Sequence, residues 1–134
     1  DVSIQAQIVA LLEQLKGELG LTYMFISHDL GLVRYFCDRI LVMYLGSVVE
    51  ELPSTEAVPR HPYTRALLDS TFSPEPAMRR TLVALKGEIP SPFDLPRGCA
   101  FAGRCPNASA RCREERPVLV GELGAHRHAC FHPL

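Results

Sequence analysis

Long hydrophobic runs are missing from this 134-residue sequence. No apolar stretch approaches the roughly 20 residues that a membrane-spanning helix needs, so the sequence predicts no such helix. A secretory signal is missing as well, because the chain starts on an acidic residue and carries no basic segment behind it.

A strong net charge is also absent, since 14 basic and 15 acidic side chains leave a formal charge of −1. With 47% hydrophobic residues, this balance is typical of a globular chain and not of a disordered one. Residues 97–134 carry six arginines against three glutamates. This surplus is small and the sequence pI is about 6.6, so we expect no nucleic-acid partner.

Two motifs of known chemistry are missing. The sequence has no G-x-x-x-x-G-K-[ST] phosphate loop, the turn whose backbone N–H groups and lysine hold nucleotide phosphates. We therefore expect this chain by itself neither to bind a nucleoside triphosphate tightly nor to hydrolyse it. The sequence also lacks the C-x2–4-C pairs that zinc sites commonly use.

Residues 21–46 are the stretch around which the rest is organised. Two apolar runs, at 23–26 and 40–43, flank a short helical segment at 29–36, and this order predicts a βαβ unit of a parallel sheet. His28 follows the first predicted strand, at the edge where α/β sheets bind ligands. Asp29 is placed to cap the helix that follows.

Further elements are predicted from local patterns. An apolar stripe predicts a core-facing helix over residues 4–19, ended by Gly17 and Gly20. Residues 48–50 favour an antiparallel strand, and Pro62 favours a helix that runs to about residue 70. Prolines punctuate residues 73–98, where a strand at 78–85 is predicted.

Several short motifs carry a family resemblance. The sequences ISHDLG at 26–31 and CDRILVMYLG at 37–46 resemble the switch-histidine region of ABC transporter ATPases, and DVSIQAQ at 1–7 resembles the end of their D-loop. The sequences HPYT at 61–64 and GEIPSP at 87–92 are similar to the oligopeptide/dipeptide importer branch. The chain also starts without methionine, and we expect it to be the C-terminal piece of a longer protein.

The resemblance implies an α/β fold: a partial P-loop NTPase sheet-and-helix remnant followed by a loop-rich, cysteine-rich extension. It implies an ATPase part at residues 1–72, a proline-rich connector at 73–98 and a cysteine-rich metal- or cluster-binding extension at 99–134. His28 would hydrogen-bond the γ-phosphate and the attacking water. Asp1 would belong to the D-loop at the dimer interface, with an indirect role in nucleotide binding.

The family also implies partners, cofactors and a location. The intact protein would use ATP and Mg²⁺ at the cytoplasmic face of the cell membrane. It would act with a second ATPase subunit, membrane permease subunits and a separate solute-binding protein. A non-enzymatic module, stapled by a metal on four cysteines, is the alternative function.

The tail carries Cys99, Cys105, Cys112 and Cys130 in the pattern C-x5-C-x6-C-x17-C. Four clustered cysteines without a secretion signal favour a metal site over disulfides, although two disulfides remain possible in oxidised material. The wide spacing suits a cuboidal iron–sulfur cluster better than zinc.

In the resembling family this tail carries a [4Fe–4S] cluster in some members, which makes the four cysteines its expected ligands. A Cys3His zinc site is the alternative, with its histidine among those near the last cysteine (His126, His128 and His132). Interleaved arginines would offset the negative charge of a cluster (Arg97, Arg104, Arg111 and Arg113).

Overall fold

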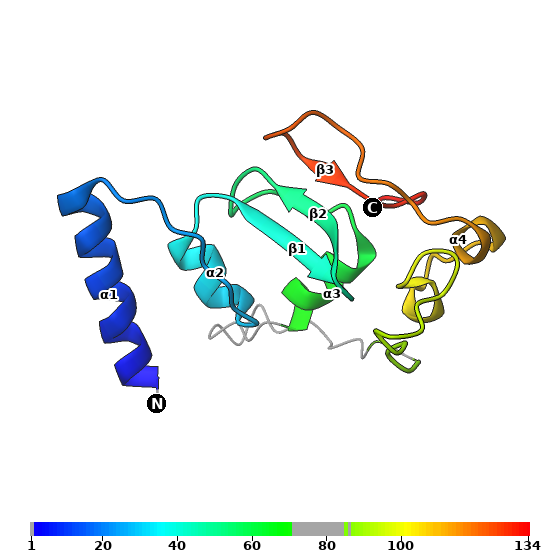
Figure 1. Cartoon of the computed structure of the whole chain (residues 1–134), viewed down its shortest axis with the longest axis horizontal. Coiled ribbons are helices and arrows are strands. Elements are labelled where there is room, and N and C mark those ends of the chain that lie inside the picture. The colour runs from blue at the N-terminus through cyan, green and yellow to red at the C-terminus, as the bar shows by residue number, and fades with distance from the viewer. Residues whose placement is uncertain (1, 71–84, 86) are drawn as a thin grey trace. The chain divides into compact units, whose positions relative to one another are not determined.

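The computed structural model describes residues 2–70, 85 and 87–134 (Figure 1). The chain divides into two compact units, the first ending at Cys37 and the second running from Asp38 to Leu134. The strand predicted at 78–85 lies, except for Leu85, outside the described residues. No described helix is both long enough and apolar enough to cross a membrane. The domain boundaries proposed at 72/73 and 98/99 stay a prediction.

The first unit contains helices α1 (Val2–Leu19) and α2 (Leu30–Phe36), both at predicted places. Gly20, with φ of +64°, follows α1 in the left-handed conformation that ends many helices. The apolar stripe of α1 is more than half exposed, at Ile4, Ile8, Leu11 and Leu19. The described part of this unit contains no strand, so the expectation that this stripe packs against a sheet stays a prediction.

Residues 22–27 do not form the predicted β-strand. Their side chains alternate as in a strand: the rings of Tyr23 and Phe25 lie 5.8 and 5.2 Å from that of Phe36, whereas Met24 and Ile26 are about nine-tenths exposed. A strand also needs a hydrogen-bonded neighbour, and in the described residues none pairs with this segment. The parallel βαβ unit predicted from residues 21–46 is therefore not formed.

The second unit is built on an antiparallel sheet of order β1-β2-β3 (Figure 1). Strands β1 (Ile40–Tyr44) and β2 (Ser47–Leu52) form the predicted hairpin, whose register shifts between Val42 and Met43. Strand β3 (Arg127–His128) pairs Arg127 with Glu51 and His128 with Glu50. The sheet thus joins the extreme tail to a hairpin about 75 residues earlier.

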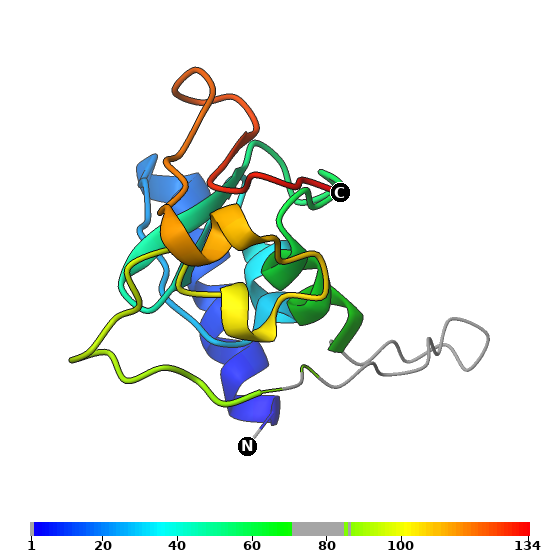
Figure 2. The ribbon, with the colours of Figure 1, turned by 90° about the vertical axis from the view of Figure 1, so that its right-hand side faces the viewer.

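An aromatic core connects the sheet, helix α3 (Pro62–Ser70) and the tail. The ring of Phe101, which is 1% exposed, lies 5.4 Å from the rings of Tyr44 on β1 and Tyr63 on α3. Two short helices of the tail follow, the 3-10 helix η2 (Ala102–Arg104) and α4 (Ala110–Glu114). Figure 2 shows both facing the viewer beside α3. The tail therefore shares its core with the hairpin.

Candidate metal centre

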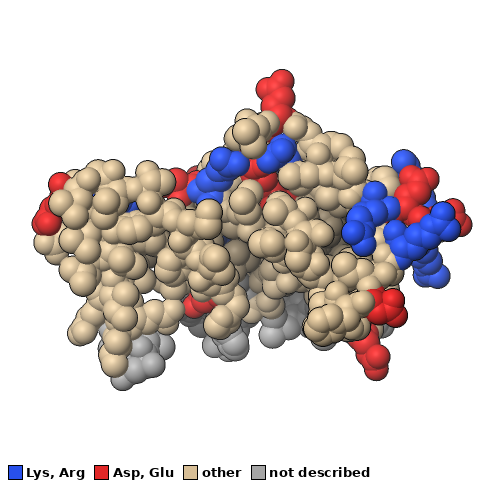
Figure 3. Space-filling model, in the orientation of Figure 1, with Lys and Arg blue, Asp and Glu red and all other residues tan. Residues whose placement is uncertain are grey.

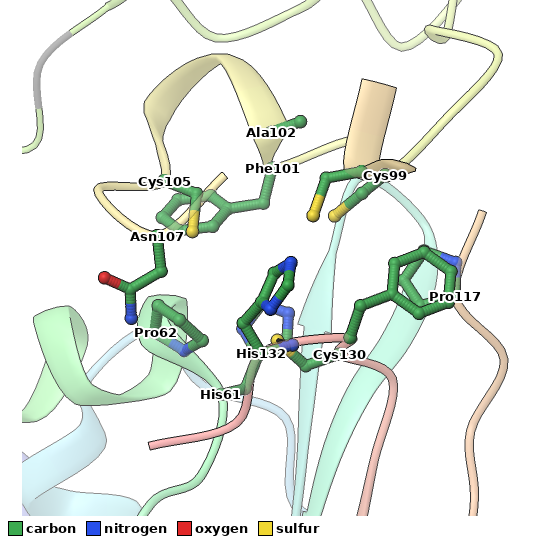
Figure 4. Close-up of a pocket in the computed structure, with 12 residues that line it drawn as sticks. His61, Pro62, Cys99, Phe101, Ala102, Cys105, Asn107, Pro117, Cys130 and His132 are labelled. Carbon is green, nitrogen blue, oxygen red and sulfur yellow. Dashed lines mark hydrogen bonds between the residues drawn. The ribbon is translucent and has the colours of Figure 1, made fainter. Parts of the chain in front are cut away.

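Four cysteines from separate parts of the tail line one cavity (Figure 4). Cys99 precedes η2, Cys105 follows it, Cys112 lies in α4, and Cys130 comes two residues after β3. The cavity is also lined by His61, by Pro62, which is the first residue of α3, and by the last histidine, His132. The structure thus brings together all four predicted metal ligands.

Backbone hydrogen bonds hold the loops around the cavity. The N–H of Cys99 donates to the carbonyl of Cys112 at 2.7 Å, and the N–H of Ala102 donates to the carbonyl of Cys99 at 3.0 Å. Gly98 permits the first contact, because a Cβ there would lie 2.4 Å from the carbonyl oxygen of Cys112. A glycine is required at this position for the two cysteine-bearing segments to approach each other.

The four cysteines line the same cavity, and backbone N–H groups donate hydrogen bonds to three of their sulfurs. Burial raises the pKa of the Cys99, Cys105 and Cys130 thiols, and the neighbouring thiols raise it further. Backbone N–H groups oppose this rise, those of Phe101 and Ala102 at Cys99, and one each at Cys105 and Cys130. Such donors favour the thiolate, the form of cysteine that binds metals.

A side-chain bridge through Ser109 links two residues that line the cavity, Cys112 and His132. The Ser109 hydroxyl lies 3.5 Å from the sulfur of Cys112 and 2.8 Å from Nε2 of His132. The backbone N–H of His132 donates to the sulfur of Cys130 at 3.4 Å. The bridge therefore joins α4 to the C-terminal segment.

The histidines near Cys130 have different roles. His126 lies away from the cysteines, with its Nε2 2.7 Å from Glu50, and only His132 of the three lines the cavity. The pKa of His128 is lowered, first by burial and next by the charge of Arg60. In the described ranges, no three His, Cys, Asp or Glu side chains are arranged to hold a single metal ion.

Of the four arginines expected to offset the charge of a cluster, Arg111 has partners of its own. Arg111 pairs with Glu115 at 2.9 Å and lies 4.0 Å over the ring of Phe131. Figure 3 shows arginines and acidic side chains mixed at the end of the molecule where α4 lies. A different arginine, Arg116, lowers the pKa of Cys99 by its charge.

His61 lines the cavity and directly precedes α3. It is 1% exposed, and its Nδ1 accepts the N–H of Tyr63 at 3.1 Å. Burial is the main reason that the pKa of His61 falls to about 4. The imidazole is therefore neutral at pH 7, with its remaining proton on Nε2. His61 thus has a structural role at the start of this helix.

Two carboxylates on β2, those of Glu50 and Glu51, are fully buried near the site, which was not predicted from the sequence. The Glu50 carboxylate accepts hydrogen bonds from the backbone N–H groups of Arg60 at 2.6 Å and His61 at 3.1 Å. It also accepts one from Nε2 of His126. Glu51 forms ion pairs with Arg39 and Arg127. Burial raises the pKa of Glu51, but the hydrogen bonds and charges of both arginines outweigh burial and lower it.

His28 belongs to the first compact unit, whereas the four clustered cysteines belong to the second. His28 is exposed and lies in the first unit, directly before α2. Asp29 caps that helix as predicted, because its carboxylate accepts the N–H of Leu32 at 3.1 Å. Asp1 lies outside the described residues.

The chain is similar to ATP-binding proteins of peptide transporters. Residues 50–112 match the family described as the oligopeptide/dipeptide transporter, C-terminal region. The chain is 47% identical to the dipeptide transport ATP-binding protein DppF of Haemophilus influenzae and 48% identical to the oligopeptide transport ATP-binding protein OppF of Escherichia coli. It is 50% identical to a putative peptide import ATP-binding protein of Brucella ovis.

These alignments cover 98% of the chain in each case. They cover 41% of the Haemophilus protein, 40% of the Escherichia protein and 42% of the Brucella protein. The chain thus spans about two fifths of the length of the curated relatives that it matches.

Proposed function

From these similarities we propose that this chain is part of the ATP-hydrolysing subunit of a peptide importer of the oligopeptide/dipeptide transporter family. The observation that carries the proposal is the 47–50% identity over nearly all of the chain to proteins named for peptide transport and ATP binding. Nothing comparable favours the alternative, a non-enzymatic module.

The proposal extends to partners that the family requires. The whole protein pairs with a second ATPase subunit at the cytoplasmic face of the membrane. It drives permease subunits that receive peptides from a separate solute-binding protein. ATP and Mg²⁺ are held by parts of the whole protein that supply the phosphate loop, which is absent from this sequence.

His28 is the proposed catalytic residue of this chain. Its side chain is exposed, and the capped N-terminus of α2 follows it directly. In this role the imidazole donates a hydrogen bond to charge that develops on the γ-phosphate and orients the attacking water. A positioned donor of this kind is worth roughly 10²–10³ in rate. Asp1 is proposed to lie at the interface between the two ATPase subunits.

The test is ATP hydrolysis and peptide uptake by the whole transporter with His28→Ala. We expect unchanged ATP binding and a turnover that is slower by roughly 10²–10³. Gln14→Ala is the control, since Gln14 is an exposed side chain of the same unit that bonds only Glu18 among the described side chains. Normal turnover by His28→Ala would remove His28 from the mechanism.

A [4Fe–4S] cluster is the cofactor that we propose for the tail, bound by Cys99, Cys105, Cys112 and Cys130. The residues fit this group: four sulfurs line one mostly apolar cavity, and donors face them. Four thiolates are the usual ligands of such a cluster, and each reaches a separate iron, so they need not converge on one point. When bound, the cluster supplies a redox centre and a structural link between tail segments.

Zinc is the second candidate. It would need three of the cysteines and His132 on one ion, and in the described residues no three such side chains are arranged in that way. Iron, acid-labile sulfide and zinc, measured per chain in the whole protein purified without oxygen, separate the two. About four irons and four sulfides support the cluster. One zinc without sulfide overturns it and leaves the importer function untouched.

A further inference from the structure

Ser109 does not do what its position in the chain predicts. It is the residue before α4, with extended backbone (ψ of 176°), where a serine hydroxyl usually accepts an N–H of the first helical turn. Asp29 makes that contact at α2, but the Ser109 side chain bonds no backbone N–H of α4. Its hydroxyl instead lies between the sulfur of Cys112 and the imidazole of His132.

The chemistry of a thiolate decides the direction of these hydrogen bonds. Because a metal-bound sulfur can only accept, the hydroxyl of Ser109 donates to Cys112 and accepts from Nε2–H of His132. The backbone of His132 donates to Cys130 at the same time. One pair of residues thereby serves two of the four sulfurs.

We propose that Ser109 and His132 are positioning residues that hold Cys112 and Cys130 and raise the reduction potential of the cluster. The proposal rests on the cofactor argued above. Reduction adds negative charge to the cluster and its sulfurs, and hydrogen-bond donors stabilise that charge. Neither residue is a ligand of the cluster.

The experiment uses the whole protein, purified without oxygen, with Ser109→Ala, Ser109→Thr and Ser70→Ala. Ser70 is the matched control, because its hydroxyl donates to the carbonyl of Leu67 at the end of α3. Iron and sulfide content and the midpoint potential, from an EPR-monitored redox titration, are measured for each. We expect Ser109→Ala to shift the oxidised/reduced equilibrium about tenfold, which lowers the potential by ~59 mV for one electron.

Ser109→Thr keeps the hydroxyl and is expected to have the unmodified potential, as is Ser70→Ala. His132→Ala should lower the midpoint potential, as Ser109→Ala does. The midpoint potential of the double variant Ser109→Ala/His132→Ala should lie little below that of Ser109→Ala, because the His132 side chain acts on Cys112 through Ser109.

The outcomes distinguish the role of Ser109 and His132 from the presence of the cluster itself. Unmodified protein without iron and sulfide overturns both. A loaded cluster whose potential is the same in Ser109→Ala overturns only the role of the pair. If Ser109→Ala fails to load the cluster, loading by Ser109→Thr supports the role of the hydroxyl, and failure of Ser109→Thr as well overturns it.

Discussion

The Nε2 atom of His126 lies 2.7 Å from Oε1 of Glu50, although 76 positions separate the two residues in the chain. The same carboxylate accepts the backbone N–H groups of Arg60 and His61. Glu50 therefore connects β2, the start of α3 and the C-terminal tail through one buried group.

Replacing Glu50 with glutamine is expected to destabilise the second unit. An amide has one oxygen and one NH2 group, so at least one of the three donors around residue 50 would face another donor. A buried donor left without an acceptor costs about 1–3 kcal/mol. Urea unfolding followed by circular dichroism measures the loss. Glu56→Gln, at an exposed glutamate, is the control and should change little; equal stability of both variants would contradict the role of Glu50.

Stability should fall in acid because of Glu51. Since its folded pKa lies below the ordinary 4.5, the ion pairs with Arg39 and Arg127 stabilise the fold fully above that value. This contribution is lost as the pH drops through the folded pKa. Urea unfolding at pH 7 and at steps below pH 4.5 should show a steeper loss for the unmodified chain than for Glu51→Gln. Parallel curves would show that Glu51 is not held as an ion pair.

Gly98→Ala should impair cofactor binding more than any nearby alanine. A Cβ at this position meets the backbone of Cys112 and Arg113 at about 2.4–2.5 Å, so the two cysteine segments must separate. Iron and sulfide per chain should fall below the unmodified value. Gly103→Ala is the matched control, since open space surrounds a Cβ there. Full loading of Gly98→Ala would mean that this approach is not needed.

This chain by itself is expected not to bind ATP at micromolar concentrations. It carries His28 but no phosphate loop to hold the β- and γ-phosphates and Mg²⁺. Isothermal titration with Mg-ATP should give no binding heat from the chain, whereas the whole protein should bind. Stoichiometric binding to the chain would reveal a nucleotide site that its sequence does not predict.

Local signals predicted the elements that depend on local physics. The β1–β2 hairpin, α3 and the cap of α2 all follow from apolar runs, Pro62 and Asp29. The prediction of a strand at 22–27 was wrong. The sequence there has strand character, but no described segment pairs with it by hydrogen bonds.

Other features depend on contacts between distant positions. Glutamates are almost never fully buried unless they are paired, so nothing near Glu50 or Glu51 indicates that both are 0% exposed. One side-chain partner of each lies in the tail, His126 for Glu50 and Arg127 for Glu51. The contact of the Ser109 hydroxyl with the sulfur of Cys112, in place of a backbone N–H of α4, is hard to predict for the same reason, since its other partner, His132, lies 23 residues away.

Glu50 and Glu51 are neighbours on β2 and face opposite sides of the sheet, and consecutive tail residues, His126 and Arg127, meet them there. A chain shortened before residue 126 would leave two negative charges without these partners. Shortening is therefore expected to require simultaneous changes on β2. Natural homologues that end early should carry uncharged residues at both positions, so that strand and tail are inherited or lost together.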